Sequence, residues 1–151
     1  MDTEYLDEGA YNQQVAADRG YELLDKKNLS FGNQRKVEVC DLLTGDRELL
    51  CVKRATRSST LSHLFAQGSV SASLMHEPKY QKKLLDALNR IVTGSAWGSP
   101  GDWKVVYAIG TNKPGSLAES LFFFSKVNLV THINEIRSRH IKVALARIEM
   151  P

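Results

Sequence analysis

The chain has 151 residues, of which 42% are hydrophobic and 25% charged, and its formal net charge is +3. This length suits a single domain over residues 1–151 with a substantial core, and the composition is that of an ordinary globular chain. No apolar run approaches the roughly 20 residues that a membrane-spanning helix needs, and the acidic start MDTEYLDEGA is unlike a secretory signal. Cys40 and Cys51 show no metal-binding spacing. We therefore expect a cytoplasmic protein with reduced thiols and no membrane partner.

Apolar periodicity predicts the elements of the first half of the chain. They are a helix over residues 7–19, a strand centred on Leu23 and Leu24, a strand over residues 36–43 and a strand over residues 47–53. Thr44-Gly45-Asp46 is the predicted hairpin turn between the last two strands. Because short turns join these strands, we expect them to form an antiparallel meander.

The second half of the chain alternates predicted helices and strands. They are a helix from about residue 61, a helix over residues 79–92, a strand over residues 103–110, a helix over residues 126–140 and a strand over residues 141–148. The later strands are reached through helices, which allows parallel pairing. The predicted fold class is therefore α/β, with a mixed central sheet (the antiparallel three-strand meander plus two later strands) flanked by helices.

The predicted hairpin carries acids on one strand and a lysine on the next. Glu38 and Asp41 lie on the first strand, and Lys53 ends the second. A two-residue turn at Gly45-Asp46 places Glu38 opposite Lys53, whereas a three-residue turn places Asp41 on the face of Lys53. The sequence leaves both registers open.

These charges are compatible with metal-dependent phosphodiester hydrolysis. That chemistry needs oxygen ligands for Mg²⁺ and a cation near the attacking water. Glu8 and Asp41 are the candidate metal ligands, and the candidate catalytic residues are Glu8, Asp41, Glu38 and Lys53. The alternative is a cross-strand pair of Glu38 and Lys53 that serves stability alone.

A basic corner rich in serine follows the third strand. It combines Arg54 and Arg57 with Ser58 and Ser59, just before a predicted helix. Cations, hydroxyl groups and the start of a helix favour phosphate, so we predict DNA or RNA as a partner. His63 and Gln67 are four residues apart on one face of that helix and are further candidates. The predicted nucleic-acid-binding residues are therefore Arg54, Arg57, Ser58, Ser59, His63 and Gln67. A solvated charged corner is the alternative.

The element order resembles the restriction-endonuclease-like fold, whose core is a helix, a three-strand meander, a helix and a further strand. The resemblance implies an acid on the first helix, here Glu8, an acid on the second strand, here Asp41 or Glu38, and (Asp/Glu)-x-Lys at the end of the third. Cys51-Val52-Lys53 occupies that last motif. The departure is Cys51, because a thiol is a poor ligand for Mg²⁺.

A second resemblance covers most of the chain. EGAYNQQVA, VEVCDLL, VKRATRSSTLSHLFAQGSVSA and FFSKVNL with VALARI are similar to the C-terminal part of a sporadically distributed bacterial protein family of longer chains. This resemblance implies a bacterial origin, a defence-linked or mobile-element context, and a chain that is a fragment or reduced version. The family brings no established activity.

Two hypotheses follow from the sequence. The first is a nuclease-like domain that binds nucleic acid and cleaves it with Mg²⁺. The second is a catalytically silent interaction domain of the same fold, which Cys51 favours. The apolar run Phe122–Phe124 is predicted as core or as an interface, either with a second copy or with the parent protein.

Overall fold

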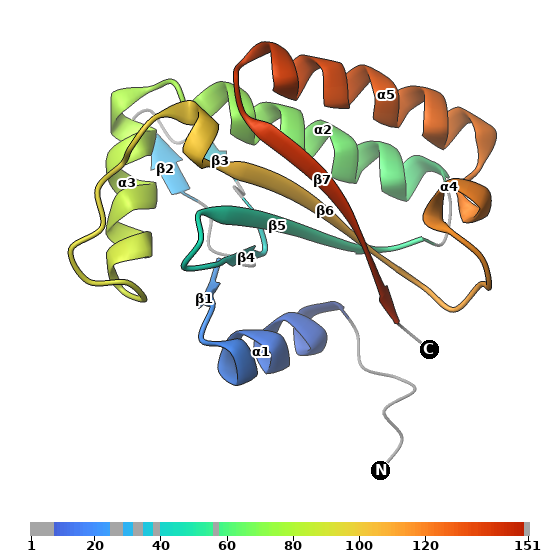
Figure 1. The fold of residues 1–151 in the computed structure, drawn as a ribbon, viewed down its shortest axis with the longest axis horizontal. Helices are drawn as coiled ribbons and strands as arrows, with labels where there is room; N and C mark the ends of the chain where they lie inside the picture. The colour runs from blue at the N-terminus through green and yellow to red at the C-terminus, as the bar shows by residue number, and fades with distance from the viewer. Residues whose placement is uncertain (1–7, 25–28, 32–34, 38–39, 56–57, 150–151) are drawn as a thin grey trace.

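The structure is a computed structural model that describes residues 8–24, 29–31, 35–37, 40–55 and 58–149 (Figure 1). The helices are α1 (Glu8–Arg19), α2 (Ser58–Leu74), α3 (Pro78–Asn89), the short 3₁₀ helix η2 (Pro100–Asp102), α4 (Leu117–Ser120) and α5 (Phe123–Ser138). The strands are β1 (Glu22–Leu23), β2 (Leu29–Phe31), β3 (Arg35–Val37), β4 (Leu42–Leu43), β5 (Glu48–Arg54), β6 (Lys104–Thr111) and β7 (Lys142–Glu149).

The central sheet is mixed and has five strands in the order β1-β4-β5-β6-β7. β1, β4 and β5 pair antiparallel, whereas β6 and β7 are parallel to β5. The predicted α/β class, with an antiparallel meander followed by two later strands, is therefore confirmed. The single strand predicted over residues 36–43 is wrong, because β3 pairs with β2 in a separate two-stranded sheet and β4 alone joins the meander.

Helices cover both faces of this sheet (Figure 1). The larger core lies under α2, α3 and α5 and contains the fully buried side chains of Phe65, Tyr80, Trp103 and Tyr107. The smaller core lies under α1, whose apolar side chains pack against a cluster centred on Val52. None of the helices in the described part of the chain has the length and apolar character required to span a membrane.

Helix α2 lies unusually close to β6 at Gly68. A Cβ atom at this position would overlap the phenol ring of Tyr107. The Tyr107 hydroxyl donates a hydrogen bond of 2.7 Å to the carbonyl oxygen of Phe65, and the two rings make an edge contact at 5.3 Å. Burial, with a smaller contribution from Cys51, raises the pKa of Tyr107 well above its ordinary value. Glycine is required here because the ring fills the space of a side chain.

The hairpin between β4 and β5 has neither of the predicted registers. Leu42 pairs with Leu50 and Leu43 with Leu49, so both alternatives are wrong. The reason lies in the turn, where Thr44 Oγ1 accepts from the backbone N–H groups of residues 46 and 48 and Arg47 takes a φ of 63°. With this left-handed residue the loop covers residues 45–47, one position later than the predicted three-residue turn, and the pairing shifts accordingly.

Helix α5 carries apolar residues on two faces. On the inner face, Leu129 and Ile136 are buried and Ile133 packs on the core. The helix begins earlier than predicted, at Phe123. Phe122–Phe124 is exposed, so its prediction as core is wrong.

Candidate functional site

The carboxyl ends of β5, β6 and β7 lie at one end of the sheet, because these strands are parallel. In open α/β sheets this end is the usual place for ligands. Helix α2 begins at Ser58, shortly after β5 ends at Arg54, so its first turn belongs to the same end. We call this region the carboxyl end of the sheet.

Helix α5 starts at the same end as α2. The Oγ atom of Ser69 lies 2.6 Å from Nδ1 of His132, and these residues come eleven and nine positions after the starts of their helices. The two helices run side by side in the same direction (Figure 1). At about 1.5 Å of rise per residue, their first turns lie at nearly the same level.

Glu8, the predicted helix acid, lies against the end of β5. Its Oε2 atom is 3.4 Å from Nζ of Lys53, and Oε1 accepts a hydrogen bond of 2.9 Å from the backbone N–H of Arg54. The side chains of Lys53 and Glu8 are 37% and 31% exposed. The structure therefore brings two of the predicted catalytic residues together in a partly solvated place.

Asp41 lies deeper and is only 6% exposed. Its Oδ2 atom accepts a short hydrogen bond of 2.6 Å from the backbone N–H of Val52. Its own backbone N–H donates to the carbonyl oxygen of Leu50 at 2.9 Å. The carboxylate thus continues the hydrogen bonding of the β4–β5 ladder by one step.

The two acids have a shared structural role along the edge of β5. Pairing with β4 covers only residues 49 and 50, whereas β5 continues to Arg54. The next two outward N–H groups, of Val52 and Arg54, are bound by Asp41 and Glu8 respectively. These N–H groups are two residues apart, which corresponds to about 7 Å along a strand. Each carboxylate therefore satisfies a different backbone donor.

The fit to Mg²⁺ depends on whether oxygen ligands converge. Mg²⁺ requires near-octahedral geometry with oxygen atoms at about 2.1 Å. Across the described ranges, no group of three or more His, Cys, Asp or Glu side chains is placed to hold a metal ion. Cys51 is fully buried in the larger core, and Glu38 lies outside the described residues. The Mg²⁺ site at Glu8 and Asp41 stays a prediction.

The predicted nucleic-acid residues follow the outer side of α2. Ser59 and His63 are exposed, and Gln67 is partly exposed one turn further along. Arg54 is partly exposed at the end of β5. Arg57 and the side chain of Ser58 lie outside the described residues. Helix α2 contains no Asp, Glu, Lys or Arg, so it presents no charge that would repel a polyanion.

Sequence reasoning missed two further cations at this end of the sheet. Arg147 donates hydrogen bonds to the carbonyl oxygens of Lys113 and Gly115, and its Nε atom pairs with Glu149 at 3.4 Å. Lys113 is exposed in the loop after β6. The parallel pairing of β6 and β7 places them here, and that pairing was left open by the sequence.

A comparison with known protein families finds one match. Residues 2–149 match the model of a family of unknown function, DUF6119. The chain belongs to this family. No curated protein and no solved structure matches it.

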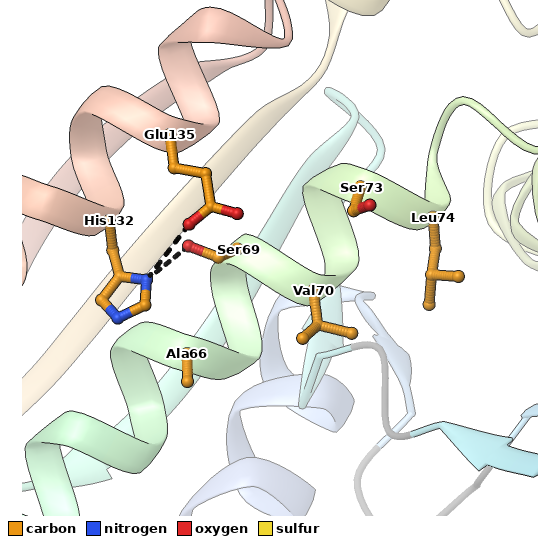
Figure 2. A pocket seen from close by; sticks show the side chains of 7 residues that line it. All are labelled: Ala66, Ser69, Val70, Ser73, Leu74, His132 and Glu135. Carbon is orange, nitrogen blue, oxygen red and sulfur yellow. Dashed lines mark hydrogen bonds and ion pairs between the residues drawn. The ribbon is translucent and has the colours of Figure 1, made fainter.

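This DUF6119 chain also has a pocket of about 310 Å³ between α2 and α5 (Figure 2). His132 Nδ1 lies 2.6 Å from Ser69 Oγ and 3.8 Å from Glu135 Oε2. Both partners face the same ring nitrogen (Figure 2), whereas a catalytic triad uses the two nitrogens separately. The sequence offered one clue, since His132 and Glu135 are three residues apart on a helix. The arrangement joins two helices and is no catalytic triad.

Proposed function

We propose that this domain binds nucleic acid at the carboxyl end of the sheet. Lys53 and Arg54 end the central strand directly before α2, and this placement carries the proposal. Ser58 and Ser59, at the start of α2, would contact phosphate together with Arg57, which precedes the helix in the sequence. His63 and Gln67 would extend the contact along the same helix. Most protein–nucleic acid hydrogen bonds go to phosphate and sugar, which suits such a set.

We also propose that the fold is restriction-endonuclease-like. The order of α1, the antiparallel strands β1, β4 and β5, then α2 and β6 supports this assignment. The inserted β2–β3 hairpin is an addition to that core. The proposed setting is the C-terminal part of a longer bacterial protein in a defence or mobile-element context.

Binding without cleavage agrees best with the geometry. The carboxylates of Asp41 and Glu8 are engaged by backbone N–H groups of β5. Cys51, in the position of the expected motif carboxylate, is fully buried beneath α2. Only Lys53 of the motif reaches the surface.

Metal-dependent phosphodiester cleavage is a second candidate, and the contact of Glu8 with Lys53 at 3.4 Å favours it. In that case Glu8 and Asp41 would hold Mg²⁺, which when bound polarises a phosphoryl oxygen and acidifies water. Lys53 would stabilise negative charge beside them.

One substitution separates the two candidates. Glu8→Gln keeps an oxygen that can accept from the Arg54 N–H but removes a negative charge beside Lys53. If the domain only binds, we expect Glu8→Gln to bind labelled DNA or RNA more tightly than the wild type, with the oligonucleotide intact in Mg²⁺ or Mn²⁺. If the domain cleaves, the wild type degrades the oligonucleotide, and Glu8→Gln, Asp41→Ala and Lys53→Ala do not.

The matched control is Lys82→Ala, which removes an exposed lysine from α3, away from the carboxyl end of the sheet. Its binding should equal that of the wild type, whereas Lys53→Ala should weaken binding. Equal binding by all variants would contradict the proposed surface.

A further inference from the structure

Three consecutive phenylalanines lie exposed where α5 begins. Phe122, Phe123 and Phe124 are 40%, 71% and 77% exposed. The rings of Phe123 and Phe124 make an edge contact at 5.5 Å, so their faces point in different directions. We call these residues the phenylalanine platform. Side chains of this size are rarely left in water without a binding function.

Two lysines lie beside the phenylalanine platform. The Nζ atom of Lys113 lies 5.0 Å from the centre of the Phe122 ring, and Lys126 is exposed in the first turn of α5. The neighbouring acids have partners, because Glu119 accepts from the backbone N–H of Ser116 and Glu149 pairs with a nearby arginine. Glu149 is balanced by its arginine, and Glu119 keeps its negative charge, so two lysines stand against one exposed acid and the charge beside the rings is positive on balance.

The platform lies at the same end of the molecule as Lys53 and Arg54. The first turns of α2 and α5 are level, as the contact of Ser69 with His132 requires. A strand of nucleic acid held at the end of β5 therefore has exposed aromatic rings at the same end of the fold.

Aromatic rings combined with cations are suited to unpaired bases. Stacking on a ring requires a free base face, which a duplex hides except at its ends, and the phosphates need cations nearby. We propose that Phe123 and Phe124 stack on unpaired bases while Lys113 and Lys126 bind the flanking phosphates. The nucleic acid that this surface takes is then single-stranded. This inference rests on the proposed function and specifies its substrate class.

The test compares a labelled single-stranded oligonucleotide of twenty thymidines with a duplex of equal length, by fluorescence anisotropy at fixed salt. We expect the wild type to bind the single strand at least about tenfold more tightly than the duplex. The double variant Phe123→Ala/Phe124→Ala should lose at least about tenfold in affinity for the single strand and keep its affinity for the duplex.

Val127→Ala/Val130→Ala is the matched control, because these exposed side chains continue the outer face of α5 without a ring. This control should bind both oligonucleotides as the wild type does. Circular dichroism of each variant checks that the helices are retained.

The outcomes separate the inference from the proposed function. If the phenylalanine variant binds single strands like the wild type while Lys53→Ala/Arg54→Ala does not, the inference is overturned and the proposed function stands. If the wild type binds neither oligonucleotide, the proposed function fails and the inference fails with it. If sedimentation shows a wild-type dimer that the phenylalanine substitutions dissociate without changing single-strand binding, the platform joins two copies and the inference is overturned.

Discussion

The two halves of β5 behave differently although they belong to one strand. In the first half, Leu49 and Cys51 are fully buried, and Val52 is 4% exposed. In the second half, Lys53 is about one-third exposed and pairs with an acid from another element. The three-residue motif Cys51-Val52-Lys53 therefore crosses from the core to the surface. The buried half contributes most to stability, and the carboxyl end is where we propose that nucleic acid binds.

The largest effect is expected in the core that packs on the buried half of β5, where α2 lies closest to β6. Gly68→Ala should destabilise the protein by about 3 kcal/mol, since the added Cβ overlaps the ring of Tyr107. Helix propensity alone predicts a gain of about 1 kcal/mol for the same change. Urea unfolding measures the difference, and an unchanged or higher midpoint would contradict the packing of α2 on β6.

A second comparison sets the two acids of the β5 edge against each other. Asp41→Ala leaves the buried N–H of Val52 without its acceptor, at a cost of about 1–3 kcal/mol. Glu8→Ala exposes a partly solvated N–H to water and should cost less than about 1 kcal/mol. Urea unfolding of both variants checks the ranking. A larger loss of unfolding free energy for Glu8→Ala than for Asp41→Ala would contradict this ranking.

Alkaline pH should destabilise the core that packs on the buried half of β5. Burial raises the pKa of Tyr107 above 10.0, and it also raises the pKa of Tyr80. The pKa of each tyrosine is higher in the folded protein than in the unfolded chain. The stability that the neutral tyrosines contribute is therefore fully present below pH 10.0 and is lost as the pH rises above it. Urea unfolding on both sides of this pH should show the loss, and Tyr107→Phe should reduce it. If Tyr107→Phe lost as much stability at alkaline pH as the wild type, titratable groups other than Tyr107 would be responsible for the loss.

The smallest effect on stability is expected at the exposed end. Lys53→Ala removes a partly exposed ion pair that contributes about 0–1 kcal/mol. The same change should weaken nucleic-acid binding and lower its dependence on salt concentration. Parallel measurements of unfolding and of binding at several salt concentrations test this division. A large loss of stability in Lys53→Ala would mean that Lys53 contributes to stability as the buried half of β5 does.

Much of the fold could be predicted from local patterns. The apolar run WKVVYAIG predicted β6, and the alternation in IKVALARI predicted β7. Trp103, the first residue of the strand predicted over residues 103–110, is fully buried. These features follow from side-chain periodicity, which the sequence displays directly.

The hairpin and the site depend on details that periodicity does not contain. The register changed because Arg47 takes a left-handed conformation and Thr44 binds the turn. Asp41 and Glu8 bind different N–H groups of β5 because β4 is too short to pair with them. No pattern in the sequence indicates how short β4 is. The placement of α5 beside α2 brought the phenylalanines to the same end as Lys53, although they are about seventy residues apart.

The most direct test of the account is the binding and integrity of a labelled single-stranded oligonucleotide with wild type and Glu8→Gln in Mg²⁺. Removing the charge beside Lys53 should strengthen binding, and the oligonucleotide should remain intact with both proteins. Cleavage by the wild type that is lost in Glu8→Gln would contradict the account, as would wild-type protein that does not bind.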